Sequence, residues 1–270
     1  MAATNSFSDG ETFALFFGLI FGAVPCLAWY KALLFHGKFG APKYQRMALY
    51  LVPALGLLLL QFVLVQYADP VVRGDRDYQW LFLLLALVWI NAARFLTPFL
   101  GISITSDVIE RNNSAAVIAL AGAFASVLIV YGGSNIGSGP TIATTLVPAF
   151  LGTLALFGFW LVLELVCHPS TAITEDRDLA TGIRLAGFLL AIAVIFGYAM
   201  AGDWISLEDT FLDLGRHGWP AITVLLIAVT LEKKLKPDPT MPRPSIPTHG
   251  LLPFAAEVLI SIASIIYVRG

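Results

Sequence analysis

The sequence predicts an all-α integral membrane protein with eight transmembrane helices. Of its 270 residues, 58% are hydrophobic and only 13% are charged, whereas a typical soluble domain carries about 25% charged residues. The mean hydropathy is +0.81. Apolar runs of about 20 residues, the length that crosses a bilayer core as a helix, recur along the whole chain. These runs are continuous rather than alternating, which excludes the strands of a membrane β-barrel.

Each apolar run must form a helix, because lipid cannot satisfy free backbone N–H and C=O groups. The first run is too long and too rich in glycine and aromatic residues for a signal peptide, so we expect it to be retained. The eight predicted spans are residues 12–35, 47–68, 80–102, 114–135, 144–167, 179–200, 218–235 and 250–268.

The connections divide the chain into three regions. The acidic segments 69–77 and 201–213 separate neighbouring spans. The proline-rich stretch 236–247 cannot be regular helix, because proline lacks the amide hydrogen, and we expect an extended cytoplasmic linker there. The predicted regions are residues 1–103 with three helices, residues 104–236 with a duplicated pair of hairpins, and residues 237–270 with the linker and the last helix.

The basic residues predict that both termini lie outside the inner (plasma) membrane, because cytoplasmic loops carry an excess of lysine and arginine. In this orientation nine basic residues face the cytoplasm, four face outward and three lie inside apolar runs. The inner nine are Lys38, Lys43, Arg46, Arg111, Arg177, Lys233, Lys234, Lys236 and Arg243; the outer four are Arg73, Arg76, Arg216 and Arg269.

The chain aligns with itself without gaps when ERNNSAAVIALAG (110–122) is set against EDRDLATGIRLAG (175–187), which places Glu110 on Glu175. The fourth and fifth spans therefore resemble the sixth and seventh, and the sequence predicts a duplicated hairpin. Both copies begin on the same face, so the repeat is parallel. The other matched pairs are Ala115 with Ala180, Ile118 with Ile183, Leu120 with Leu185, Ala121 with Ala186, Gly122 with Gly187 and Gly132 with Gly197.

The first copy also carries a family resemblance. Its pattern consists of Glu110, Asn113, Ala115, Ala116, Ile118, Ala121 and Gly122. This pattern resembles the bacterial membrane family known as domain of unknown function 350, over roughly residues 104–235. The second copy departs from it, with Asp178 in place of Asn113 and with Arg184 inside the helix. The resemblance implies tandem two-helix hairpins and implies no activity.

Two stripes of small residues predict close helix packing. Ala14, Gly18, Gly22 and Cys26 recur every four residues in the first span, and Ala115, Ala119 and Ala123 do so in the fourth, with Gly122 and Ser126 alongside. Small residues let helix backbones approach each other in a membrane. Such stripes serve either an oligomer interface or packing within one chain, and we favour packing within the chain.

Charged residues inside the spans are candidates for function, because each costs about 2.5–3.5 kcal/mol at the bilayer centre. Arg94 lies roughly 10 Å from the inner end of the third span, with Asn91 and Thr97 on the same face. Arg184 and Glu164 also belong to the inner half, which permits an arginine–glutamate cluster. The alternative is that each arginine extends to lipid phosphates; for Arg94 we favour a buried role.

Glu257 lies near the middle of the last span, with Ser261 and Ser264 on the same stripe. In lipid this stripe would be unpaired, so it must face protein or water. The carboxyl group is expected to be protonated or paired with an arginine. Two interpretations remain equally weighted: a site for a proton or a cation, and a neutral packing residue.

Two further features have both a functional and a structural interpretation. The pairs Glu110 with Glu175 and Glu164 with Glu232 would form a cation-attracting vestibule, although acids at helix starts also serve as caps, which we favour for Glu110 and Glu175. The glycine-rich segment 132–140 would line a pore with its carbonyl groups, although a tight turn explains it better.

The sequence contains no catalytic, zinc-binding, nucleotide-binding or haem-attachment motif. We therefore predict no enzyme, no cofactor and no metal. The net charge of −2 argues against a nucleic-acid partner. The expected partners are membrane lipids and, as options, further copies of the chain or other membrane subunits. The leading function hypothesis is a channel or transporter for a small ion or polar solute; the alternative is a structural or accessory subunit of a larger membrane complex.

Overall fold

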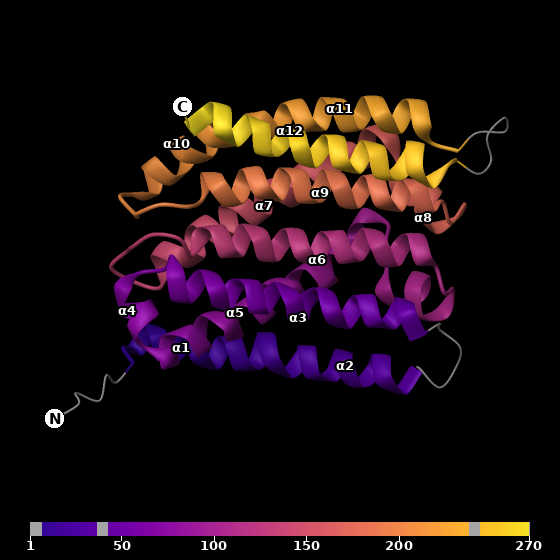
Figure 1. Cartoon of the computed structure of the whole chain (residues 1–270). Coiled ribbons are helices and arrows are strands. Elements are labelled where there is room, and N and C mark those ends of the chain that lie inside the picture. The colour runs from indigo at the N-terminus through magenta and orange to yellow at the C-terminus, as the bar shows by residue number, and fades with distance from the viewer. Residues whose placement is uncertain (1–6, 37–42, 238–243, 270) are drawn as a thin grey trace.

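The computed structural model describes residues 7–36, 43–237 and 244–269, and the regular structure in these ranges is helical, without a β-strand (Figure 1). The first half contains α1 (Asp9–Phe17), η1 (Gly18–Ala23), α2 (Val24–His36), α3 (Lys43–Gln66), α4 (Pro70–Gly74), α5 (Arg76–Leu96), η2 (Thr97–Leu100), η3 (Ile104–Glu110) and α6 (Ser114–Ser134). The second half contains α7 (Ala143–Cys167), α8 (Pro169–Thr174), α9 (Leu179–Ala199), α10 (Leu207–Gly218), α11 (Pro220–Leu235), η4 (Ile246–Leu251) and α12 (Leu252–Arg269).

Within the described ranges, seven helices are long and apolar enough to cross a membrane. A further span exists if α10 and α11, which meet at an angle of 46°, cross the membrane as one bent unit. Seven of the eight predicted apolar segments coincide with these helices, and the other, residues 218–235, corresponds to α11. The chain is a multi-pass helical membrane protein. Two connections are more ordered than their sequence indicates: segment 201–213 includes the first half of α10, and the proline-rich stretch ends in the π-helix η4. The middle of that stretch, residues 238–243, lies outside the described residues.

The helices form two layers (Figure 1). In the first layer α3, α6, α9 and α12 run side by side, each in contact with the next. Behind them lie α5 and α7. The first helix packs on α5 through η1, and α11 packs on α7. One end of the bundle, named here the α4 end, carries α4 and α10; the opposite end, named the α8 end, carries α8 and the C-terminal end of α11.

The core lies between α6 and α9. Their spans are 78% and 83% buried, compared with 22% for the span of α3 and 17% for that of α12. The two helices approach closely because small residues face each other. A Cβ atom added to Gly122 would lie 2.6 Å from the Cβ of Ala186, and one added to Gly182 would lie 2.6 Å from the carbonyl oxygen of Ala115. The small-residue stripe of the fourth span therefore packs within the chain.

The stripe of the first span also packs within the chain. Ala14, Gly18, Gly22 and Cys26 are buried. A Cβ atom on Gly22 would lie 2.8 Å from the carbonyl oxygen of Leu84 in α5. Packing within the chain, the interpretation favoured from the sequence, is thus what the structure shows for both stripes.

Candidate functional site

A buried ion pair joins α9 to α11 close to the α8 end. Arg184 and Glu232 are 1% and 3% exposed. The Arg184 Nε donates to Glu232 Oε1 at 2.7 Å, and its Nη2 donates to Glu232 Oε2 at 2.9 Å. Two parallel hydrogen bonds to one carboxylate give this pair a fixed geometry as well as charge compensation. Arg184 is therefore held by protein and does not extend to lipid phosphates.

The remaining donors of Arg184 are used within the same cluster. Its Nη1 donates to the carbonyl oxygen of His249 at 2.5 Å, and its Nη2 donates to Thr181 Oγ1 at 2.7 Å. The Thr181 hydroxyl donates in turn to Asp178 Oδ2 at 2.6 Å. Arg184 thereby ties the start of α9 and the end of α11 to the π-helix η4. We name the set Asp178, Thr181, Arg184 and Glu232 the α9–α11 cluster.

Asp178 has a second role as the N-cap of α9. Its Oδ1 accepts from the amide of Ala180 at 3.3 Å, and its Oδ2 accepts from the amide of Thr181 at 2.8 Å. These bonds satisfy backbone donors that have no partner inside the helix. The cap and the ion pair are therefore linked through the Thr181 hydroxyl.

Glu257 of α12 lies beside this cluster. It is 1% exposed, and its Oε2 has no hydrogen-bond partner among the described residues. Its carboxyl group is close enough to Glu232 and Arg184 for electrostatic interaction. Gly187 of α9 makes room for it, because a Cβ atom there would lie 3.0 Å from Glu257 Oε2. The structure thus places one arginine and two carboxyl groups together between α9, α11 and α12.

The predicted serine stripe of α12 does not serve Glu257. The Ser261 hydroxyl donates to the carbonyl of Val258 at 2.8 Å, and the Ser264 hydroxyl donates to that of Ile260 at 2.7 Å. Serine hydroxyls in helices commonly bond to the backbone of the preceding turn. Ser261 is fully buried, so the prediction that this stripe faces protein is correct for Ser261 and Glu257.

The predicted cluster of Arg94, Arg184 and Glu164 does not form. Glu164 Oε1 accepts instead from the hydroxyl of Ser170 at 2.5 Å, and its Oε2 accepts from the amide of Ser170 at 3.2 Å. Glu164 thus accepts from the first turn of α8, where backbone N–H groups have no partner inside the helix. Arg184 pairs with Glu232 instead. The physical reason is proximity along the chain: α8 follows α7 directly.

Arg94 is half-buried and connects α5 to α2. Its Nη1 donates to the carbonyl of Pro25 at 3.3 Å, and its guanidinium carbon lies 5.7 Å from the centre of the Trp29 ring. It has no carboxylate partner within the described part of the chain. Arg94 therefore packs against α2, where it makes a cation–π contact with Trp29.

Asn91 of α5 forms hydrogen bonds to the backbone of η1. Its Nδ2 donates to the carbonyls of Gly22 at 2.8 Å and Phe21 at 3.3 Å, and also to that of Leu87 at 2.8 Å. Gly22 and Phe21 belong to the π-helix η1, whose wider turn changes the backbone hydrogen bonding. Asn91 is therefore a structural residue that binds this turn.

Replacing Asn91 with leucine is expected to lower the free energy of unfolding by about 1 kcal/mol, because it removes a hydrogen-bond donor from buried carbonyl groups. The measurement is thermal or detergent-induced unfolding of the purified protein. Ala92→Leu is the matched control, because Ala92 is the exposed neighbour on the same helix. Equal stability of the two variants would show that the Asn91 contacts contribute nothing.

Helix caps were expected from Glu110 and Glu175, and this prediction is wrong. Both side chains are exposed, and the N-caps are Asn113 and Asp178. Asn113 Oδ1 accepts from the amides of Ala115 and Ala116. Shorter side chains next to the first helical turn reach its free amides more directly than a glutamate three residues earlier.

The two connections that enter α6 and α9 have the same local geometry at equivalent positions of the two aligned segments. Asn112 and Arg177 both have positive φ angles, of 53° and 55°. The amide of Asn113 donates to the carbonyl of Asp107 at 3.0 Å, and the amide of Asp178 donates to that of Ala172 at 2.9 Å. The cap residues Asn113 and Asp178 are themselves an aligned pair.

Three features of this site were not predicted from the sequence: the pairing of Arg184 with Glu232, the Thr181 hydroxyl between Arg184 and Asp178, and the space at Gly187 that the Glu257 carboxyl group occupies. A signal existed for Asp178, because aspartate immediately before an apolar helix is typical of an N-cap. Within the described residues no group of three or more histidine, cysteine, aspartate or glutamate side chains is placed to hold a metal ion.

Comparison with known proteins finds a family model that matches the centre of the chain, over less than half of its length. Residues 78–200 match the model of the family described as Domain of Unknown Function (DUF350). No curated protein and no solved structure matches the chain. The match runs from α5 to α9, so it begins and ends earlier than the predicted extent of 104–235 and includes the third predicted span. The resemblance to this family that the sequence predicts is confirmed, with residues 78–200 as the part of the chain that matches it.

Proposed function

We propose that this protein carries a small ion or polar solute across the inner (plasma) membrane with a proton as the coupling ion, and that Glu257 binds the proton. The observation that supports this is the state of the Glu257 carboxyl group. It is buried near the middle of a membrane span, and one of its oxygens has no partner among the described residues. Ionisable residues inside membrane spans are rare and mark proton or substrate routes.

The charge balance of the site favours a proton over a metal cation. Arg184 already compensates Glu232 through two hydrogen bonds. An ionised Glu257 would therefore add an uncompensated negative charge in a site of low dielectric, so the carboxyl group is more stable there with its proton. Loss of that proton makes the net charge of the site more negative by one. Such a change would favour a different packing of α12 against α9, which is what coupling requires.

We also infer that the fold contains two copies of one helical hairpin, α6–α7 and α9–α11, related by the alignment of residues 110–122 with residues 175–187. The paired φ angles, the paired caps and the parallel contact of α6 with α9 support this inference. The α4 end lies outside in this proposal, because the basic residues Arg111, Arg177 and Lys233 belong to the α8 end. No catalytic role is proposed.

The test is proton movement in liposomes that contain only this protein. A pH-sensitive dye inside the vesicles reports proton flux while gradients of potassium, sodium, ammonium, choline or amino acids are imposed in turn. Wild-type protein is expected to move protons with at least one of these solutes, and Glu257→Gln is expected to reduce the rate at least tenfold. Glutamine has the size of glutamate and fits beside Gly187, but it cannot exchange a proton.

Glu175→Gln is the matched control, because Glu175 is an exposed glutamate at the α8 end. It is expected to leave the flux unchanged. Gel filtration and thermal unfolding establish that all three proteins are folded. Absence of proton movement with every solute, or equal flux in wild type and Glu257→Gln, would contradict the proposal.

A second candidate function is that of an accessory subunit, and one surface feature favours it. An apolar groove of about 590 Å³ crosses α3, α6 and α9. Its walls include Gly132, Gly133 and Gly197, which would let another helix approach closely. A density map of the native complex from membranes would show either protein or lipid in this groove. Further copies of the chain are the other occupant that the same map would identify.

A further inference from the structure

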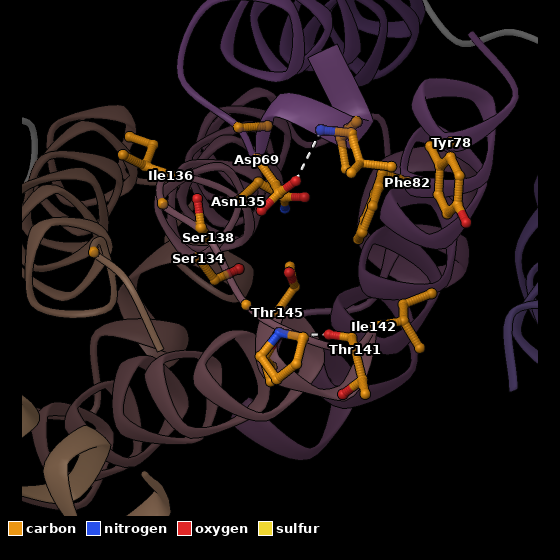
Figure 2. Close-up of a pocket in the computed structure, with 18 of the residues that line it drawn as sticks. Asp69, Tyr78, Phe82, Ser134, Asn135, Ile136, Ser138, Thr141, Ile142 and Thr145 are labelled. Atoms are coloured by element: carbon orange, nitrogen blue, oxygen red, sulfur yellow. Dashed lines mark hydrogen bonds between the residues drawn. The ribbon is translucent and has the colours of Figure 1, made fainter. Parts of the chain in front are cut away.

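A polar cavity of about 280 Å³ opens at the α4 end, away from Glu257 and the α9–α11 cluster. Figure 2 shows its walls, which come from segments far apart in the sequence. They include Glu11 of α1, the connection from α3 to α4 at Asp69, the first turns of α5 at Tyr78 and Phe82, and the glycine-rich segment after α6. Neither Glu257 nor the α9–α11 cluster lines this cavity.

The glycine-rich segment 132–140 is a fixed turn, as favoured from the sequence, and it lines this cavity. The amide of Gly137 donates to the carbonyl of Tyr67 at 3.2 Å, and the amide of Gly202 donates to that of Ile136 at 2.8 Å. Gly137 has φ +111°, and a side chain there would overlap the backbone of Gly202. The cavity wall is therefore held by three chain segments and does not depend on a ligand for its shape.

The ionisable lining of the cavity is acidic. Glu11 and Asp69 line it, and no lysine, arginine or histidine of the described residues does so. Asp69 Oδ1 accepts from the amide of Val71 at 2.8 Å. Glu11 Oε2 accepts from the amide of Ser8 at 2.7 Å, and Tyr78 lies close to this carboxylate. Both acids are thus oriented, and together they give the cavity a negative potential.

A buried amide and two aromatic rings complete the walls. Asn135 is 5% exposed, and its Nδ2 donates to the carbonyl of Tyr131 at 2.7 Å. No hydrogen bond reaches its Oδ1 from the residues that the structure describes, so this oxygen is a free acceptor in the lining. The rings of Tyr78 and Phe82 form the facing wall in Figure 2.

We propose that this cavity binds a small alkylammonium group. A protonated or quaternary nitrogen pairs with the carboxylates of Asp69 and Glu11, an N–H or O–H of the ligand donates to Asn135 Oδ1, and the methylene or methyl groups lie against Tyr78 and Phe82. The volume of about 280 Å³ lies just below the range of about 300–1,000 Å³ for small-molecule pockets, which restricts the ligand to a few carbon atoms.

An organic cation fits better than a metal ion. The described residues offer no group of three or more acidic, histidine or cysteine ligands, whereas divalent cations such as Ca²⁺ need six or more oxygens. Aromatic walls favour a carbon-bearing cation over an inorganic one. This inference is independent of the proposed transport, because binding at the α4 end requires neither flux nor Glu257.

The test is isothermal titration calorimetry on the full chain in maltoside micelles, which contain no ammonium group. Ethanolamine and choline are the probes, and 3,3-dimethylbutanol is the neutral analogue of choline. We expect at least one amine to bind, the neutral analogue not to bind, and Asp69→Asn to weaken binding at least tenfold. Asparagine retains an oxygen for the Val71 amide, so the cap of α4 survives the change.

Two matched variants separate this site from general surface charge. Asp77→Asn removes an exposed acid of α5 that does not line the cavity and is expected to leave binding unchanged. Tyr78→Phe keeps the ring and is expected to bind, whereas Tyr78→Leu removes it and is expected to weaken choline binding several-fold.

The same ammonium chemistry is found in soluble amines and in phospholipid headgroups. Nanodiscs of phosphatidylethanolamine and of phosphatidylglycerol distinguish the two sources. Higher thermal stability in phosphatidylethanolamine that is lost in Asp69→Asn would support a headgroup ligand, even if free amines do not bind. The proposal is overturned if neither free amine nor headgroup shows an effect, or if Asp69→Asn and Tyr78→Leu bind as wild type does.

Discussion

Replacing Glu232 with leucine is expected to lower the free energy of unfolding by about 3–5 kcal/mol, the usual consequence of breaking a buried ion pair from one side. The substitution leaves the Arg184 guanidinium 1% exposed and without its carboxylate. The Thr181 hydroxyl and the His249 carbonyl still accept from it, but neither carries a compensating charge. Detergent-induced unfolding, followed by tryptophan fluorescence, measures the loss.

The double variant Arg184→Met/Glu232→Leu is the control for this experiment. It removes both charges and keeps the volume of the pair, which in other proteins is neutral or stabilising. We expect it to recover most of the stability that the single variant loses. If Glu232→Leu alone unfolds as wild type does, then the two side chains do not form the ion pair described above.

The helices could be predicted because the signal is local. Each span is a continuous apolar run, and the small residues at Gly18, Gly22 and Gly122 recur at helical spacing. Such patterns indicate both where a helix lies and which of its faces another helix can approach. The order of α10 and η4 was not predictable in this way, because both lie in polar or proline-rich sequence where neighbours determine the conformation.

The site was predictable only in part, because pairing depends on which helices are neighbours. The sequence leaves open whether Arg184 pairs with an acid or extends to lipid phosphates, and Glu164 and Glu232 both end predicted spans at the same depth. The structure resolves the choice. Glu164 accepts from Ser170 in α8, which follows α7 directly. In the alignment of residues 110–122 with residues 175–187, Arg184 falls on Ala119, so only the second segment has an arginine at this position.

A methyl group at Gly133 is expected to separate α6 from α9 and to lower the free energy of unfolding by about 3 kcal/mol, the upper part of the usual range for overpacking. A Cβ atom at this position would overlap the backbone of Gly197. Because the obstacle is main chain, no rotamer change relieves the contact, and the two most buried helices must move apart. Gly133→Ala and thermal unfolding of the purified protein test this.

Gly132→Ala is the matched control, because it adds the same methyl group one residue earlier on α6. No atom lies within 4 Å of the added Cβ at Gly132. Both substitutions gain about 0.5–1 kcal/mol from replacing glycine in a helix, so the difference between the two variants isolates the contact with α9. A Gly133→Ala protein as stable as Gly132→Ala would mean that α6 and α9 are farther apart than the structure places them. In that case the backbones of α6 and α9 would not be in close contact, and the packing of the core would not depend on the small size of Gly122 and Gly182.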